Sequence, residues 1–418
     1  MIVAASFLAL TVPYSGSLYV WVEPGLYAGF FFGFVALGQF ISSVKWEARV
    51  AVAVVYAAVI AAALYGAITL MIFVFALSDQ VANLSAFIPW GFVNIRYWGH
   101  IATWLMPLLA LAVLIGPLRE QKLWRFLAAT GAALWWWIIF LSASRGTLIG
   151  LAFGVLLAMA LIGRPALPWL KMFGRYFIYG VIAWLVLSVV IPLVILDHSE
   201  LRTLHATTSG RMPLFVEAWR MSLENFPFGM GPQSWLTHEV ITDEYKKSSK
   251  FAHPHNMYLM WAAEYGWLII GSLLLLAGQA IRLFWHRREE MRANHEGVRV
   301  LPLAAFTASV SAALVHASAS SVFIAPGSML VGFMVLCVFW GLISPSSTRV
   351  PQKGKARGLF AAVATLLFGI LAIFWLREVA IYHHAMEDDR DSRYEGVPYG
   401  TPPRFWYYGD FPRRLPGQ

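Results

Sequence analysis

Long runs of apolar residues, separated by short polar segments, extend from the start of the chain to about residue 382. A helix needs roughly 20 apolar residues to cross a hydrocarbon core of about 30 Å. Within 300–348 there is no Asp, Glu, Lys or Arg, which leaves room for two spans with Pro326-Gly327 as the natural turn. The pattern predicts an all-α polytopic membrane protein with about eleven spans, at 2–22, 24–43, 50–78, 97–116, 123–143, 146–163, 168–196, 256–281, 301–322, 325–345 and 358–382.

Composition supports this prediction. Hydrophobic residues make up 59% of the 418 residues and charged residues only 13%, and the mean hydropathy is +0.65. A soluble protein of this size cannot bury so much apolar surface, because much of any folded chain faces water. The single cysteine, Cys337, excludes a disulfide framework within the chain. No basic segment precedes the first apolar run, so we expect no cleavable signal peptide.

The net charge of +9 raises the possibility of nucleic-acid binding. The basic residues are, however, concentrated in alternate short loops, which is the pattern that sets the orientation of membrane proteins. This distribution predicts a cytoplasmic N-terminus and no nucleic-acid partner. The residues concerned are Lys45, Arg49, Arg119, Lys122, Arg125, Arg164, Lys171, Arg175, the run from Arg282 to Arg299, Arg349, Lys353, Lys355 and Arg357.

The spans and loops predict four segments along the chain. Residues 1–196 form an N-terminal transmembrane bundle of about seven spans, and 197–255 form a long loop with an amphipathic helix. Residues 256–384 form a C-terminal bundle of about four spans, and 385–418 form a polar tail. The predicted orientation places the loop and the tail on the outer side of the membrane.

An unusual polar segment, Ser142-Ala143-Ser144-Arg145-Gly146, lies between two charge-free spans. An arginine at membrane depth is costly and is a functional candidate by default. The alternative is an interfacial arginine whose head group reaches the lipid phosphates. The residue alone does not decide between these interpretations.

The long outer loop has a defined pattern of its own. Ser209-Gly210-Arg211 precedes a predicted amphipathic helix, which Ser209 or Gly210 can cap and which tolerates Pro213 in its first turn. We expect this helix to lie along the outer membrane face. Its apolar side comprises Leu214, Phe215, Ala218, Trp219 and Met221, and its polar side comprises Glu217, Arg220 and Glu224.

Two further elements complete the loop. The turn Phe228-Gly229-Met230-Gly231-Pro232 could expose backbone N–H groups to a phosphate or could be only a turn. His253-Pro254-His255-Asn256 lies directly before the predicted span 256–281. A metal site needs three or four ligands, and the other histidines of the loop, at 198, 205 and 238, are scattered and expected at the surface. General acid–base chemistry at His255 is the favoured interpretation, and a helix-capping role is the alternative.

Arginine side chains bind phosphate oxygens through two donors at once, and a histidine can accept a proton near neutral pH. Arg145, Arg211 and His255 on one side of the membrane therefore suit a substrate with a diphosphate leaving group and an attacking hydroxyl.

These segments, followed by Glu264-Tyr265-Gly266-Trp267, resemble the O-antigen ligase and polymerase superfamily in their order and in the position of the long loop. The resemblance covers about residues 140–275. It implies a GT-C-like bundle of about 11–12 transmembrane helices with a long periplasmic loop, in the bacterial inner membrane. It also implies transfer of a glycan from undecaprenyl diphosphate to a sugar hydroxyl of lipid A–core, inverting, without metal or cofactor and on the periplasmic face.

The resemblance also implies roles for individual residues. Arg145 and Arg211 would bind the diphosphate, and His255 would act as the base. The adjacent positions Ser144, Ser209, His253 and Asn256 would help to bind the substrate. Glu264 we expect to be a packing partner within the bundle.

Other functions stay open. A polymerase or a protein O-oligosaccharyltransferase of the same superfamily would use the same elements. A transporter or flippase would instead carry ionisable residues near mid-membrane and broken helices in paired positions. The predicted spans are largely free of charge at their centres, which weighs against transport.

Overall fold

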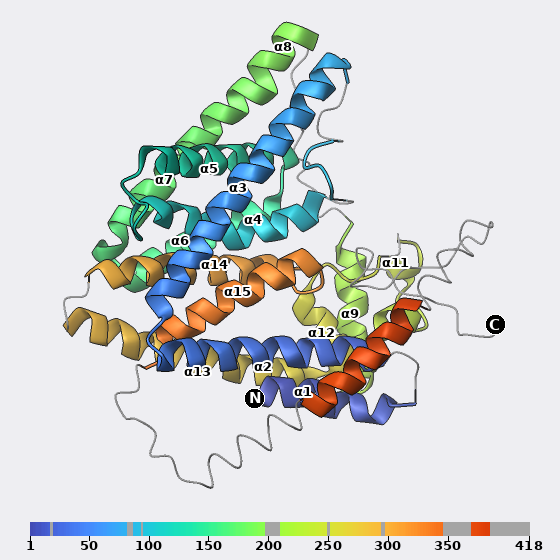
Figure 1. The fold of residues 1–418 in the computed structure, drawn as a ribbon. Helices are drawn as coiled ribbons and strands as arrows, with labels where there is room; N and C mark the ends of the chain where they lie inside the picture. The colour runs from blue at the N-terminus through green and yellow to red at the C-terminus, as the bar shows by residue number, and fades with distance from the viewer. Residues whose placement is uncertain are drawn as a thin grey trace. The chain divides into compact units, whose positions relative to one another are not determined.

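A computed structural model describes residues 1–16, 20–81, 87–92, 95–196, 210–248, 251–293, 297–345 and 369–384. These residues form helices joined by turns and bends, with no strand among them (Figure 1). Eight of the helices are long and apolar enough to cross a membrane. The described part of the chain is therefore an all-α polytopic membrane protein, as the apolar runs predicted.

The candidate spans follow most of the predicted runs. They are α2 (Val22–Ser43), α3 (Glu47–Ser78), α5 (Lys122–Ser142), α6 (Arg145–Ile162), the continuous segment Arg164–Leu196, α13 (Trp267–Ala293), Val300–Ala317 within α14 (Gly297–Ala317), and α15 (Pro326–Ile343). The segment Arg164–Leu196 contains η4 (Arg164–Ala166), α7 (Leu167–Leu185), a π-helical stretch (Val186–Val190) and α8 (Ile191–Leu196).

Some of the predicted elements differ from the structure in detail. The runs 2–22 and 97–116 form shorter apolar helices, α1 (Ile2–Thr11) with η1 (Val12–Tyr14) and α4 (Ile95–Leu109) with η3 (Ala110–Val113). The predicted turn Pro326-Gly327 is instead the first turn of α15, where proline is tolerated because it needs no helical N–H partner. Of the run 358–382, only the part from residue 369 lies within the described residues, and 369–384 are helical.

A further difference, in the run 256–281, bears on the site. The run 256–281 is broken at Gly266, where the backbone takes a positive φ of 81°. A separate helix, α12 (Met257–Tyr265), precedes the break, and the candidate span α13 follows it and extends to Ala293. The histidine motif therefore opens a short buried helix and not a transmembrane span.

The chain divides into two compact units, each assembled from distant segments. Unit 1 comprises Met1–Ala36, Gly210–Ala280 and Pro345–Gln418. Its described helices include α9 (Met212–Glu224), α10 (Ser234–Thr237), α11 (Asp243–Lys246) and α12. One part of its core is aromatic: Phe7 of α1 stacks on Tyr27 of α2 at 4.9 Å and meets Tyr265 of α12 edge-on at 4.9 Å.

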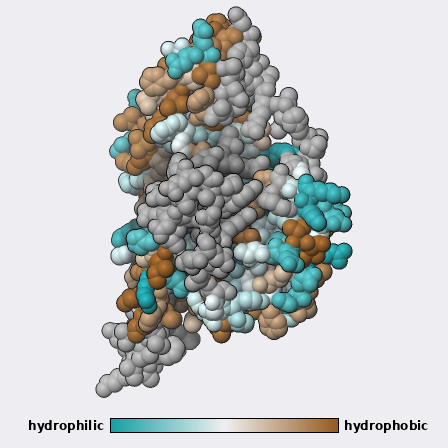
Figure 2. All heavy atoms as spheres, turned by 90° about the vertical axis from the view of Figure 1, so that its right-hand side faces the viewer, coloured by the Kyte–Doolittle hydropathy of each residue, from teal (hydrophilic) through white to brown (hydrophobic). Residues whose placement is uncertain are grey.

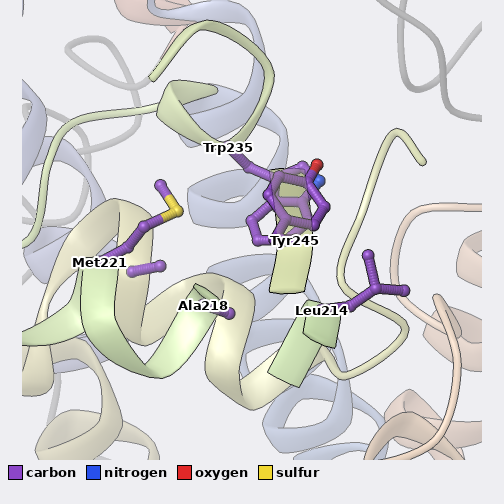
Figure 3. Packing of buried hydrophobic residues seen from close by; sticks show 6 residues of the cluster. Leu214, Ala218, Met221, Trp235 and Tyr245 are labelled. Atoms are coloured by element: carbon purple, nitrogen blue, oxygen red, sulfur yellow. The ribbon is translucent and has the colours of Figure 1, made fainter. Parts of the chain in front are cut away.

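A second core in unit 1 joins the short helices of the loop. Leu214, Ala218 and Met221 of α9 point toward Trp235 of α10 and Tyr245 of α11 (Figure 3). Ala263 of α12 completes this buried cluster. The described part of the loop, residues 210–248 and 251–255, is therefore a folded part of unit 1 with its own apolar core. Burial of large aromatic and aliphatic side chains stabilises it.

Unit 2 comprises Leu37–Ser209 and Ile281–Ser344. The long helix α3 crosses and contacts α15, α14, α4 and α5 (Figure 1). Helices α6 and α14 approach closely because α6 presents a glycine every fourth residue, at 146, 150 and 154. A Cβ at position 150 would lie only 2.6 Å from the carbonyl oxygen of Ala312. Small residues at this spacing let helix backbones approach within a membrane.

Exposed apolar side chains are common on the candidate spans, and hydrophobic residues form patches on the coloured part of the face in Figure 2, most clearly at the upper left. On α3 alone, Ile60, Leu64 and Val74 are more than half exposed. Such surfaces are unfavourable in water and are expected where lipid is the solvent.

Candidate functional site

His253 and His255 lie side by side in unit 1, immediately before α12. Their side chains are almost fully buried, at 7% and 5% exposure, and their rings meet edge-on at 4.4 Å. The backbone N–H of His255 donates to Nδ1 of His253 at 3.1 Å. A ring nitrogen that accepts carries no proton, so His253 is held with its proton on Nε2. His253 thus fixes the backbone that presents His255.

His255 has a left-handed backbone conformation, with φ at 58°. For a residue other than glycine this conformation costs roughly 1–2 kcal/mol, and such strain gathers at functional sites. Phe251 packs against the imidazole with 5.1 Å between ring centroids. The carbonyl of Phe251 is held in turn by Nε1–H of Trp235 at 2.8 Å. Several contacts therefore hold the strained turn in place.

Asn256 caps α12. Its Oδ1 accepts from the backbone N–H groups of Tyr258 at 3.0 Å and Leu259 at 3.1 Å. These are two of the N–H groups that have no partner within the helix, and an asparagine at this position stabilises a helix by about 1 kcal/mol. The capping role considered for His255 belongs to Asn256, while substrate binding by Asn256 stays a prediction.

The glycine turn before α10 closes the other end of α12. The N–H of Met230 donates to the carbonyl of Ala263 at 2.8 Å, and the N–H of Gly231 donates to the carbonyl of Glu264 at 2.9 Å. These two amides satisfy the last carbonyls of α12. Of the two interpretations of this turn, the structural one holds, because both amides are already used within the protein.

The contact between the turn at Gly229–Gly231 and the end of α12 at Gly266 is called the glycine interlock here. Close backbone packing explains why it contains glycine on both sides. Gly229 and Gly266 both have positive φ, at 76° and 81°. A Cβ on Gly229 would lie 2.8 Å from the carbonyl carbon of Glu264, and a Cβ on Gly266 would overlap the carbonyl oxygen of Pro227. Glu264 itself is fully buried, and its Oε1 accepts from the N–H of Trp235 at 3.3 Å. The expected packing role of Glu264 agrees with these contacts.

Arg211 stands at the start of α9 and is half-buried. It occupies the N-cap position after Gly210, whose φ is 68°, and the structure shows Pro213 in the first turn, as predicted. Neither Ser209 nor Gly210 occupies the N-cap position, and Ser209 lies outside the described residues.

The faces of α9 differ from the predicted ones. Trp219 is 45% exposed, although the pattern placed it with Leu214 on one apolar side, and Glu217 is fully buried, although it was expected on the polar side. At about 100° per residue, Glu217 in fact lies within about 60° of both buried positions, 214 and 221. Outward-facing apolar residues, more than a third exposed, form a second stripe at Met212, Val216, Trp219 and Leu223.

Glu217 is the centre of a buried polar cluster. Its Oε1 accepts from the N–H of Ile241 at 2.7 Å and from Nε2 of His238 at 2.8 Å, and its Oε2 accepts from the N–H and the hydroxyl of Thr242. Burial alone would raise the pKa of Glu217, but the hydrogen bonds from Thr242, Ile241 and His238 together lower it below its ordinary value. The local sequence around Glu217 gives no signal for this cluster, because the donors lie more than 20 residues away in the chain.

The side chain of His238 is only 3% exposed, so its expected place at the surface is wrong. Its Nδ1 faces the carbonyls of Ser234 and Trp235, at 3.2 and 3.1 Å, and its Nε2 faces Glu217. All of these partners are oxygen atoms that can accept a hydrogen bond, so each ring nitrogen of His238 faces an acceptor. The pair ties α10 to α9.

The polar segment around Arg145 lies in unit 2. Helix α5 ends where Ala143 takes a left-handed conformation, with φ at 48°, and α6 begins two residues later at Arg145. The Arg145 side chain is exposed. Ser144 is half-buried, and its hydroxyl lies 2.9 Å from that of Thr147 in the first turn of α6. Arg145 therefore stands at the outward corner of a tight turn between two candidate spans.

Two buried histidines, His100 of α4 and His316 of α14, lie beside this turn. Their rings are 4.9 Å apart. Nδ1 of His316 lies 2.8 Å from the hydroxyl of Thr103, and Nε2 of His100 lies 2.7 Å from the hydroxyl of Ser320. The sequence did contain a signal for them, because each histidine interrupts an otherwise apolar run.

The predicted site residues thus fall into two groups. His253, His255 and Asn256 occupy one turn of unit 1, and Arg211 opens α9 in the same unit. Ser144 and Arg145 belong to unit 2. Among the described residues, no three His, Cys, Asp or Glu side chains form a group that could hold a metal ion.

Comparison with known proteins adds one match. A family model described as O-antigen ligase matches residues 129–276. The matched segment contains every predicted site residue and both halves of the glycine interlock. No curated protein and no solved structure matches the chain.

Proposed function

We propose, from the membership of this chain in the O-antigen ligase and polymerase superfamily, that it is an O-antigen ligase of the bacterial inner membrane. It transfers a glycan from undecaprenyl diphosphate to a sugar hydroxyl of lipid A–core on the periplasmic face. The chain is a multi-pass membrane protein, which suits a lipid-linked donor and a lipid-anchored acceptor.

The observation that supports this proposal most is the geometry of His255. A buried imidazole sits on a strained backbone, immediately before a capped helix, within the segment that matches the family. Helix capping does not require a histidine here, because Asn256 already caps α12. The cost of a strained turn is ordinarily retained where a side chain must be presented in one orientation.

In the proposed reaction, the acceptor hydroxyl attacks the anomeric carbon of the donor sugar. The new glycosidic C–O bond forms as the bond from that carbon to the diphosphate oxygen breaks, with inversion at the anomeric carbon. The hydroxyl proton passes to the imidazole of His255, and the bonding electron pair leaves with the diphosphate. A positioned base contributes about 10²–10⁴-fold to such a step.

Negative charge grows on the leaving diphosphate as its bond to the sugar breaks. We assign Arg145 and Arg211 to this charge, because guanidinium groups donate two parallel hydrogen bonds to phosphate oxygens. Preorganised cations at such a position are worth several kcal/mol of transition-state stabilisation. The mechanism uses no metal and no cofactor, so EDTA should leave transfer unchanged.

Asparagine is the sharpest substitution for testing His255, because it tolerates the left-handed backbone better than alanine but cannot accept the proton. In a membrane-vesicle transfer assay, His255→Asn should lose about 10²–10⁴-fold in rate. His286→Ala, which removes an exposed histidine from α13, is the control and should stay at the wild-type rate. Wild-type transfer by His255→Asn would refute the base assignment.

A polymerase of the same superfamily remains the second candidate, since the family match includes both activities. Deletion of the gene separates the two. Loss of a ligase leaves a full-length glycan on undecaprenyl diphosphate that is not joined to lipid A–core. Loss of a polymerase leaves single repeat units, and that result would replace the ligase proposal.

A further inference from the structure

Both neighbours of Arg145 in the chain are held in place, although the Arg145 side chain itself is exposed. On one side, Ser144 lies against α4: a Cβ on Gly99 would be only 3.1 Å from its hydroxyl. On the other side, Gly146 lies against α14: a Cβ added there would be 2.6 Å from both Cδ2 and Nε2 of His316. The direction of the arginine therefore depends on what fixes these two contacts.

A chain of hydroxyl groups fixes the first contact. The Thr147 hydroxyl donates to the carbonyl of Gly99 at 3.1 Å. Each hydroxyl has one proton, so Thr147 can only accept from Ser144, at 2.9 Å. This chain ties the first turn of α6 to α4 through a single carbonyl.

The same carbonyl determines the orientation of His316. The Thr103 hydroxyl also donates to the carbonyl of Gly99, at 2.8 Å, so it has no proton left to give to His316. The 2.8 Å contact between Thr103 and Nδ1 of His316 must then be donated by the imidazole. This bond fixes the ring plane, and the edge of that ring is the surface on which Gly146 rests.

We propose that His316 and Thr103 are positioning residues for Arg145: they set the direction of the first turn of α6, so that the guanidinium is presented to the donor diphosphate. The inference rests on the diphosphate role proposed for Arg145. His316 acts through Nδ1 and through the shape of its ring, not by contact with the substrate. A displacement of about 1 Å in such a group can cost as much as about 100-fold in rate.

The test measures binding of geranylgeranyl diphosphate, a polyprenyl diphosphate, to the full-length protein in nanodiscs. Thr103→Val keeps the side-chain shape but removes the acceptor, and His316→Ala removes the ring. Each should weaken binding about 10-fold. His316→Asn places an amide N–H close to the position of Nδ1, so it should bind within about threefold of the wild type. Failure of the asparagine variant to recover binding would overturn the role of Nδ1.

Ser309→Ala is the matched control. Ser309 of α14 donates to the carbonyl of Trp104 of α4, a buried contact between the same two helices. Its removal should reduce thermal stability without changing diphosphate binding. Equal weakening by Ser309→Ala and Thr103→Val would show general loosening of the helices and would overturn the positioning role, as would wild-type binding by both Thr103→Val and His316→Ala.

An Arg145→Ala background separates this inference from the proposed function. If His316 acts through Arg145, then His316→Ala should have little further effect once the arginine is gone, since the two residues are coupled. Wild-type binding by Arg145→Ala alone would refute the diphosphate role itself. A weakened Arg145→Ala variant combined with a fully additive effect of His316→Ala would refute only the positioning inference.

Discussion

Replacing Glu217 with glutamine should loosen the folded loop of unit 1. The carboxylate accepts two hydrogen bonds on each oxygen, and two of its four donors are the backbone N–H groups of Ile241 and Thr242. Glutamine keeps one acceptor oxygen and turns an NH₂ toward the other pair. Whichever way the amide is placed, one backbone N–H faces a donor and loses its partner.

The magnitude follows from this count of partners. A buried unsatisfied N–H costs about 1–3 kcal/mol, and hydrogen bonds to a charged group contribute about 1.5–3 kcal/mol. We expect Glu217→Gln to lower the free energy of local unfolding by about 2–4 kcal/mol, which is about a 30- to 1,000-fold increase in opening. The control is Glu224→Gln, an exposed position on the same helix, which should change stability by less than about 0.5 kcal/mol.

Hydrogen exchange of peptides that cover residues 236–248, measured by mass spectrometry in nanodiscs, reads this opening directly. Because the pKa of Glu217 is lowered in the folded protein, its stabilisation is present above the ordinary glutamate pKa of about 4.3 and is lost as pH falls through the lowered value. Wild-type protection should therefore decrease only under acid conditions, and this decrease should be absent from Glu217→Gln. Exchange in Glu217→Gln within about threefold of the wild type at neutral pH would refute the reasoning.

Three further predictions concern the interlock, the arginines and the outer face of α9. Gly266→Ala should prevent the loop from packing, because its Cβ would overlap a backbone carbonyl; the variant should show a markedly lower Tm and faster proteolysis, and a wild-type Tm would contradict this. Arg145→Lys and Arg211→Lys should both weaken donor binding despite their retained charge, since lysine cannot bind phosphate through two parallel donors; near-normal donor titrations would refute the assignment. A spin label at Leu223 should be accessible to oxygen and shielded from a water-soluble nickel reagent, whereas one at Glu224 should be more accessible to nickel; equal nickel access would place the outer stripe of α9 in water.

The spans could be predicted because a transmembrane helix requires a long continuous run of apolar residues, which is visible in the sequence itself. The break at Gly266 could not, because apolar residues continue on both sides of it. Helix α12 is apolar for a different reason from α13: Met260, Trp261 and Ala263 are buried in protein, and hydropathy does not distinguish protein from lipid.

Pairings between distant segments account for the other differences. The spacing of Glu217 along α9 predicted a residue on the polar, exposed face. In the structure it is buried, because residues 238, 241 and 242 donate hydrogen bonds to its carboxylate. His316 lies 170 positions from Gly146, and nothing local to either residue indicates that they meet. Local pattern identifies candidate chemistry, whereas burial depends on partners that the local pattern does not contain.

The structure also divides the recognised motifs by what each residue does. Gly229 and Gly266 are explained by close packing, and Asn256 caps α12, while substrate binding by Asn256 stays a prediction. Arg145 and His255 are not explained in this way: one is exposed at a rigid corner, and the other is held on a strained backbone that Asn256 would not need for capping. A fold under selection for stability alone would not retain an unfavourable turn at His255, since a glycine there would relieve the strain. The proposed chemistry assigns a role to the strained turn at His255, which helix capping does not explain.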